Sequence, residues 1–257
     1  MDAILQTKEL TISFGGHIAV DSVSVHIPMK KFTSIIGPNG AGKTTFFNLL
    51  SGQLSPTKGS IIYKDKDITK HSATERTRLG IGRSFQITNV FPNLTVLENV
   101  RLAVQSQAKV RYNMIAHYRH FKSLEQKAYQ LLEKVFLQDK ADSKAINLAH
   151  GEKRKLEIAM LLALETEILL LDEPTAGMSL EEVPAIIDVI KHIKQHEDRT
   201  IVLIEHKMDM IMDLSDEVLV LFHGELLAKG TPEEIVKNEM VQSAYLGGMY
   251  DEEEQFT

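Results

Sequence analysis

The first third of the chain is a series of short alternating or apolar runs separated by turn residues. The runs lie at residues 10–14, 20–27 and 32–36. They are broken by Gly15-Gly16 and by Pro28-Met29-Lys30, which are typical of turns. Short apolar or alternating runs with such boundaries are typical of β-strands. The pattern therefore predicts a β-rich beginning, with one helix at residues 43–50 and a short hairpin at residues 60–68 around Lys64 to Lys66.

The pattern changes between about residues 90 and 164, where apolar residues recur with the period of a helix. Helices are predicted at residues 94–107, 121–136 and 151–164. After this helical part, apolar runs at residues 167–171 and 200–204 lie on either side of a helical stretch at 180–196. Strands that alternate with helices are typical of crossover connections and a largely parallel sheet. The sequence therefore predicts an α/β protein with a helical lobe.

Two of the later helices begin with capping signals. Thr231-Pro232 followed by Glu234, and Ser179 followed by Glu182, fit an N-cap with a glutamate at the third helical position. Pro184 conflicts with the second of these starts, because proline beyond the first turn removes a helical hydrogen bond. The pattern leaves that boundary undecided.

Composition narrows the class of protein. The chain has 257 residues, of which 43% are hydrophobic and 25% charged, as in one globular domain with a lobe. It has no cysteine, so disulfides and thiolate metal sites are excluded, and its net charge of −6 disfavours a nucleic-acid partner. The longest apolar runs, such as residues 168–171, fall far short of the roughly 20 residues that cross a bilayer. We expect no spanning helix and no secretory signal.

The clearest chemical signal is the segment Gly37-Pro38-Asn39-Gly40-Ala41-Gly42-Lys43-Thr44-Thr45. It follows a strand and opens a helix, which is the context of a phosphate-binding P-loop. Glycines let the backbone turn its N–H groups toward an anion, and the helix N-terminus adds partial positive charge. A lysine at a helix start is unfavourable unless an anion lies in front of it. We therefore expect Lys43 to reach the β- and γ-phosphates and Thr44 to bind Mg²⁺.

An acidic pair, Asp172-Glu173, follows the apolar run at 167–171. This is the carboxyl end of a predicted strand, where open α/β sheets bind ligands. Taken alone, such a pair is more often a helix cap or a solvated turn. In a chain with a P-loop, Asp172 suits Mg²⁺ coordination and Glu173 suits polarising an attacking water.

Together these motifs make the chain resemble the ABC ATPase family over nearly its whole length. The resemblance places the ring of Phe14 against adenine, although Phe14 alone would be interpreted as a core residue at a strand end. It matches Gln86, after Ser84-Phe85, to the glutamine loop that touches Mg²⁺ and the transmembrane partner. It matches His206 to the switch histidine near the γ-phosphate.

A second family motif is matched only in part. Leu148-Ala149-His150-Gly151-Glu152 resembles the signature, usually Leu-Ser-Gly-Gly-Gln, which caps the γ-phosphate of the opposite subunit. Ala149 replaces the serine and Glu152 replaces the glutamine. Residues 175–179 resemble the loop that signals between the two ATP sites, with Ser179 in place of the usual aspartate. The departure at Ser179 predicts altered coupling between the sites.

The resemblance implies an ABC ATPase fold, which is a P-loop NTPase core of mixed sheet with an N-terminal antiparallel β subdomain and an inserted helical lobe. Residues 1–257 would form a single domain, with the core and β subdomain at 1–89 and 165–257 and the lobe at 90–164. The resemblance also implies hydrolysis of ATP with Mg²⁺. Catalysis would rest on Glu173, His206 and Gln86, and Mg²⁺ would be held by Thr44, Gln86 and Asp172.

The implied partners are those of a transporter. The first is a second ABC ATPase subunit, identical or related, which would form a dimer that sandwiches ATP. The others are the transmembrane permease subunits and, indirectly, an extracytoplasmic substrate-binding protein. No nucleic acid is expected. The subunit would lie peripherally on the cytoplasmic face of the cell (inner) membrane.

Finer details resemble the ATP-binding subunits of importers for branched-chain amino acids. They include Phe14-Gly15-Gly16, Leu-Glu-Ile-Ala at 156–159 and the ending Ala244-Tyr245-Leu246-Gly247. Transport of urea or other amides, transport of lipopolysaccharide, and iron–sulfur cluster assembly by a soluble ABC ATPase are the alternatives. His117 and His120 have metal-compatible spacing, but no third ligand is evident, so we expect a solvated or partner-facing helix there.

Overall fold

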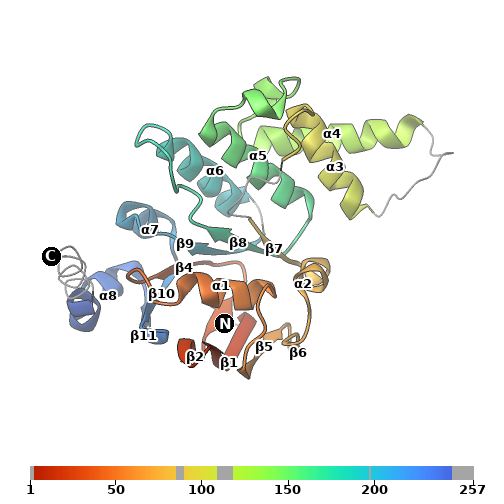
Figure 1. Cartoon of the computed structure of the whole chain (residues 1–257). Coiled ribbons are helices and arrows are strands. Elements are labelled where there is room, and N and C mark those ends of the chain that lie inside the picture. Colours follow the sequence, from red (N-terminus) through yellow and green to blue (C-terminus); the bar gives the residue numbers. More distant parts are fainter. Residues whose placement is uncertain (1–2, 85–89, 109–117, 197, 245–257) are drawn as a thin grey trace. The chain divides into compact units, whose positions relative to one another are not determined.

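The computed structural model describes residues 3–84, 90–108, 118–196 and 198–244 (Figure 1). These residues form two compact units. The first unit contains the described residues of 1–79, 170–173 and 199–257, and the second contains those of 80–169 and 174–198.

The smaller sheet of the first unit is antiparallel. Its strands are β1 (Ala3–Phe14), β2 (His17–Val23), β3 (His26–Pro28), β5 (Lys58–Tyr63) and β6 (Lys66–Asp67). Strand β1 pairs with β2, β3 and β5, and β5 pairs with β6. Lys64 and Asp65 between β5 and β6 both have positive φ, as a two-residue type I′ hairpin turn requires. The predicted hairpin and the β-rich beginning are confirmed.

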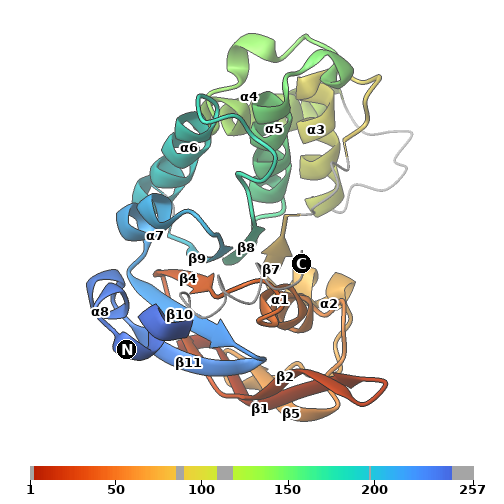
Figure 2. The same ribbon diagram turned by 60° about the vertical axis from the view of Figure 1, so that its left-hand side comes forward.

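The larger sheet of this unit is mixed. Its strands are β4 (Phe32–Ile36), β8 (Ile168–Asp172, of which residues 170–172 belong to this unit), β9 (Thr200–Ile204), β10 (Glu217–Phe222) and β11 (Glu225–Gly230). They lie in the order β11-β10-β4-β9-β8. Strand β4 is parallel to β9 and β10, and β11 runs antiparallel beside β10 (Figure 2). All residues of β4 and β9 are buried, as expected of parallel strands covered on both faces.

Within the described residues, the first unit has four helices whose two ends are both defined. They are α1 (Lys43–Ser51), α2 (Ala73–Leu79), α7 (Met208–Leu214) and α8 (Pro232–Val236). Residues of the larger sheet and of α7 and α8 share one apolar cluster, which includes Ile36, Ile211 and Ile235. The hydroxyl of Thr231 accepts a hydrogen bond from the Glu234 N–H at 3.3 Å, and the Glu234 carboxylate accepts one from the Thr231 N–H at 2.8 Å. The predicted cap of α8 is therefore confirmed.

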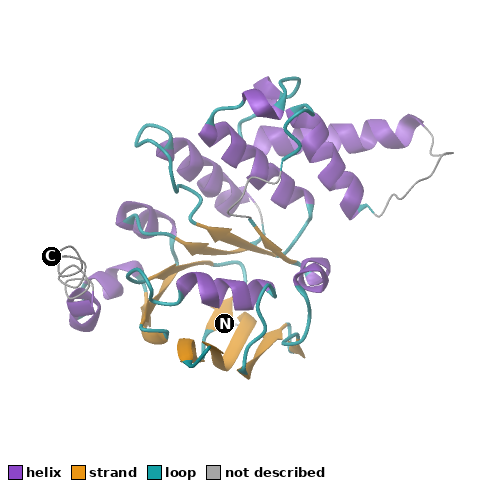
Figure 3. Cartoon of the chain, in the orientation of Figure 1, coloured by secondary structure: helices purple, strands orange, loops and turns teal. Residues whose placement is uncertain are grey.

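The second unit consists mainly of helices (Figure 3). Its elements are β7 (Ile81–Arg83), α3 (Val96–Gln107), α4 (Tyr118–Lys134), the short 3-10 turns η1 (Gln138–Lys140) and η2 (Ala145–Asn147), α5 (His150–Ala163), the first residues of β8, and α6 (Val183–His196). Helix α3 packs against α4 and α5, and both of these contact α6. The three helices predicted between residues 94 and 164 are confirmed within a few residues of their bounds.

The helix boundary that the sequence left undecided lies at Val183, where α6 begins, so Ser179 is not its N-cap. Ser179 and Glu182 do pair, since the Glu182 carboxylate accepts hydrogen bonds from the Ser179 N–H and hydroxyl at 3.2 Å each, but they do so ahead of the helix. Pro184 then falls at the second helical position, where a missing N–H costs no intrahelical bond.

The second unit extends beyond the predicted lobe at residues 90–164, since β7 and α6 belong to it. The assignment of the chain to a core and an inserted lobe stays a prediction. Among the residues that the structure describes, no helix is both long and apolar enough to cross a membrane.

Candidate functional site

The loop between β4 and α1 has a backbone that only glycine can form at two points. Gly37 has a φ of 152°, and a Cβ added there would lie 2.1 Å from the carbonyl oxygen of Leu221. Gly42, the N-cap of α1, has a φ of 90°, and a Cβ there would lie 2.4 Å from the carbonyl oxygen of Ala19. The loop is therefore held tightly against β10 and β2. This packing fixes the N-terminus of α1, whose unpaired N–H groups attract anions.

Lys43 is the first residue of α1 and is only 6% exposed. Its ammonium donates hydrogen bonds to the carbonyl oxygens of Gly37 at 2.7 Å and Pro38 at 2.8 Å. Burial lowers the pKa of Lys43, while the negative charges of Glu173 and Asp172 act in the opposite direction. A phosphate in front of the helix would add further negative charge and stabilise the ammonium.

Two carboxylates and a histidine come from the ends of neighbouring strands. Asp172 is the fully buried last residue of β8, and Glu173 follows it with a φ of 43°. The Glu173 N–H donates to the carbonyl oxygen of Ile204 at the end of β9, at 3.0 Å. This bond holds Glu173 in a strained backbone conformation of the kind that is common at functional sites. His206 lies two residues beyond β9, and its Nε2 is 2.9 Å from the Glu173 carboxylate.

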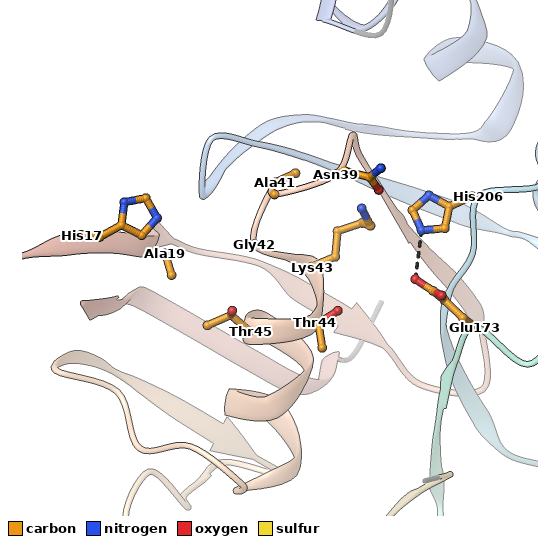
Figure 4. A pocket seen from close by; sticks show the side chains of 11 residues that line it. His17, Ala19, Asn39, Ala41, Gly42, Lys43, Thr44, Thr45, Glu173 and His206 are labelled. Carbon is orange, nitrogen blue, oxygen red and sulfur yellow. Dashed lines mark hydrogen bonds and ion pairs between the residues drawn. The ribbon is translucent and has the colours of Figure 1, made fainter. Parts of the chain in front are cut away.

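Lys43, Glu173 and His206 line one open pocket of about 300 Å³ (Figure 4). The lining consists of residues 39–45 of the loop and α1, together with His17, Ala19, Glu173 and His206. The structure thus brings the predicted P-loop and the predicted catalytic residues Glu173 and His206 together. Gly37, Pro38, Asp172 and Phe14, which were also predicted for the site, are not among the residues that line this pocket.

His17 and Ala19 are the pocket residues that sequence reasoning missed. They are two apart on β2, so their side chains share one face of that strand. The only signal in the sequence was this spacing, and it becomes informative only once β2 is known to lie beside the P-loop. Phe14, the predicted adenine contact, ends β1 and is 47% exposed.

Of the remaining predicted residues, some lie outside the described part of the chain and the others belong to the second unit. Gln86 and His117 lie outside the described residues, and the side chain of His120 is not described either. Leu148 to Glu152 belong to the second unit, where α5 begins at His150. Ala149 is the N-cap of α5 and has no side-chain oxygen to accept a hydrogen bond, but the Glu152 carboxylate accepts one from the Ala149 N–H at 2.9 Å. Half of a capping box therefore remains.

The donors around the pocket suit a polyphosphate with a magnesium ion. Backbone N–H groups, a lysine ammonium and the hydroxyls of Thr44 and Thr45 face the same space. Within the described part of the chain, no group of three or more His, Cys, Asp or Glu side chains is arranged to hold a metal. Mg²⁺ does not need such a group, because it binds through one or two carboxylates together with phosphates and waters.

Comparison with known proteins gives this geometry a family. The family model described as ABC transporter matches residues 20–176. The chain belongs to the ABC transporter family. A second model, described as branched-chain amino acid ATP-binding cassette transporter, matches residues 225–251. The chain is 38% identical to the high-affinity branched-chain amino acid transport ATP-binding protein LivG of Escherichia coli K12, over 95% of this chain and 98% of that one.

Solved ABC transporter structures share the fold. An ATP-binding cassette in its ADP conformation matches with a TM-score of 0.82 and 27% identity, covering 96% of this chain and all of that one. A dimeric cassette in a post-hydrolysis state, bound to ADP and phosphate, matches with a TM-score of 0.74 and 26% identity over 89% of this chain and 98% of that one. The predicted ABC ATPase fold is confirmed.

Proposed function

We propose that this chain is the ATP-binding and ATP-hydrolysing subunit of an importer for branched-chain amino acids. The observation that carries the proposal is the 38% identity to LivG over nearly the whole of both chains. The match of residues 225–251 to a model of branched-chain amino acid cassettes supports it independently, because those residues lie outside the part matched by the general ABC transporter model.

The P-loop is the proposed phosphate site. The fixed backbone from Gly37 to Gly42 presents N–H groups at the start of α1, and the Lys43 ammonium already lies within the loop, on the carbonyl oxygens of Gly37 and Pro38. Thr44 and Asp172 are the described residues that would hold Mg²⁺, which neutralises charge between the β- and γ-phosphates when it is bound. Gln86 is the third proposed magnesium contact.

Glu173 and His206 are the proposed catalytic residues at the γ-phosphate end. The 2.9 Å contact orients the Glu173 carboxylate, and the Glu173 to Ile204 hydrogen bond fixes its backbone. A carboxylate held in this way accepts a hydrogen bond from an attacking water and so orients it. His206 holds both the carboxylate and, once nucleotide is bound, the region of the γ-phosphate.

Hydrolysis is proposed to occur between two ATPase subunits, with Leu148 to Glu152 of one facing the P-loop of the other. The dimeric cassette with ADP and phosphate supports this arrangement for a related protein. Contacts to the γ-phosphate that exist only in the closed dimer favour closure before hydrolysis and opening after it. The second subunit would be identical or related, and both would bind permease subunits at the cytoplasmic face of the membrane and act indirectly on a substrate-binding protein.

The test is uptake of labelled leucine, isoleucine and valine by cells that lack this chain and its redundant importers. Wild type should restore uptake, as should Glu233→Gln, a matched control in the exposed part of α8. Glu173→Gln should bind ATP without restoring uptake. Restoration by Glu173→Gln would overturn its catalytic role. Unchanged uptake in the deletion strain would overturn the cargo. It would direct the next test to transport of urea, other amides or lipopolysaccharide, or to iron–sulfur cluster assembly.

A further inference from the structure

The loop that follows Glu173 is held by the beginning of α5 within the second unit. Residues 174–182 lead to α6, and α5 packs against α6 (Figure 2). Hydrogen bonds join this loop to the first turns of α5. They run from Arg154 Nε to the Pro174 carbonyl oxygen at 3.2 Å, between His150 Nε2 and the Ala176 carbonyl oxygen at 3.4 Å, and from the Gly151 N–H to the Glu182 carboxylate at 3.3 Å. The loop therefore takes its position from α5.

Arg154 makes the contact that lies nearest to Glu173 in the sequence. Its side chain is 11% exposed, and its Nη1 donates a hydrogen bond at 2.7 Å to the carboxylate of Glu157, which is 9% exposed. A guanidinium is planar and rigid, so a bond at one nitrogen also fixes the direction of the others. Glu157 therefore holds the Nε–H of Arg154 in line with the Pro174 carbonyl oxygen.

The backbone at Glu173 is of a kind that needs such support. A residue before proline is normally extended, yet Glu173 has a φ of 43°. A conformation of this kind persists only when the surrounding structure holds it in place. On one side the Glu173 N–H donates to the carbonyl oxygen of Ile204, and on the other the next residue, Pro174, accepts the hydrogen bond from Arg154. The chain is thus anchored on both sides of the carboxylate.

We propose that Arg154 is a positioning residue for ATP hydrolysis, which holds Pro174 and thereby keeps the Glu173 carboxylate in the place where it orients water. The proposal rests on the proposed function, because it takes Glu173 to be catalytic. Arg154 touches neither nucleotide nor water in this role. Without its hydrogen bond the strained backbone at Glu173 relaxes, and a small displacement of a catalytic group is enough to slow a reaction strongly.

The experiment compares two variants that differ only at Arg154. Arg154→Met alone would leave the buried Glu157 carboxylate without its cation, which is strongly destabilising. The test variant is therefore Arg154→Met/Glu157→Gln, and its reference is Glu157→Gln, which keeps the guanidinium. ATP hydrolysis by the full chain with Mg²⁺ is measured over a range of ATP concentrations, and urea unfolding compares the stability of the two variants.

The kcat of the double variant should be about tenfold below that of Glu157→Gln, while KM for ATP stays within about twofold. This split is expected because a displaced carboxylate weakens stabilisation of the transition state and leaves nucleotide binding intact. Lys155→Met is the matched control on the same helix. The Lys155 ammonium lies 5.9 Å from the centre of the Phe136 ring, and its removal should leave kcat within about twofold of wild type.

A second comparison separates positioning from a general effect on the fold. If Arg154 acts through Glu173, its loss should matter little once the carboxylate is gone. In a Glu173→Gln background, the two changes should lower the residual single-turnover rate by less than about twofold. An equal fall in both backgrounds would overturn the positioning role, as would an unchanged kcat or a fall confined to ATP affinity. A failure of the proposed function looks different, because wild type itself would then not hydrolyse ATP.

Discussion

Replacing Arg76 with methionine should destabilise the first unit more than its position on a short surface helix suggests. Arg76 lies on α2 and is 0% exposed, although it is a charged residue. Its guanidinium donates hydrogen bonds to the carbonyl oxygens of His71, Thr69 and Leu50, each at 3.0 Å, and to that of Leu49. Burial lowers the pKa of Arg76 to about 10, and the charge of Asp67 acts in the opposite direction.

Two of these carbonyl groups belong to the last turn of α1, the helix that begins at the P-loop. Carbonyls there lack partners within the helix, and a cation stabilises them. Arg76→Met removes every donor and leaves four carbonyl groups to find others, at about 1–3 kcal/mol for each group that stays unpaired. The carbonyl of Leu49 is partly compensated, because it also accepts a hydrogen bond from the Gly52 N–H at 3.2 Å.

Relief of the buried charge acts in the opposite direction. Removing a guanidinium from a dry site returns several kcal/mol of desolvation free energy, to order of magnitude. Two or three carbonyls left unpaired outweigh this gain. The free energy of unfolding should therefore fall by about 3 kcal/mol. Arg76→Lys keeps the charge but cannot span all four oxygens, and should lose roughly half as much.

The measurement is urea unfolding followed by circular dichroism, because the chain contains no tryptophan. Arg78→Met is the matched control, since Arg78 is exposed on the same helix and should change stability by less than about 0.5 kcal/mol. The reasoning is refuted if Arg76→Met unfolds at the wild-type urea concentration. It is also refuted if Arg78→Met costs as much, because the effect would then belong to helix propensity and not to the four carbonyls.

Three further predictions concern the loop, its lysine and acid stability. Gly37→Ala places a Cβ against the Leu221 carbonyl and should cost about 3 kcal/mol of stability and most ADP binding; an unchanged melting midpoint would contradict this. Lys43→Met should lose about a hundredfold in ADP affinity, which calorimetry measures. Its free energy of unfolding should change by only about 1 kcal/mol in urea unfolding, because removing a buried charge offsets the loss of two hydrogen bonds. The hydrogen bond from Arg101 lowers the pKa of Glu98, so the charged Glu98 stabilises the fold above pH 4.5. Glu98→Gln should therefore lower the free energy of unfolding by less than about 1 kcal/mol there. In urea unfolding this difference should disappear as the pH falls through the lowered pKa.

Local chemistry explains why much of the fold could be predicted from the sequence. A short run rich in β-formers and bounded by turn residues predicted β4, and the glycine-rich loop with Lys43 predicted the start of α1, because both depend on neighbours within a few residues. The Thr231 cap is local in the same sense. The place of Glu173 after an apolar run, in a chain with a P-loop, predicted its role. The resemblance to a family then added the order of the motifs, and with it the predicted role of His206.

Contacts between segments far apart in the chain decided the rest. The order of β4, β9 and β8 in the sheet brings the P-loop to Glu173 and His206, which are more than a hundred residues away in sequence. The same kind of contact turns His17 toward the pocket, leaves Phe14 outside it, and buries Arg76 against the end of α1. The sequence by itself determined most of the segments that become strands and helices, and it predicted which residues would carry the chemistry. Only the tertiary structure decided which side chains share a pocket, because strand order and register are set by packing over the whole unit.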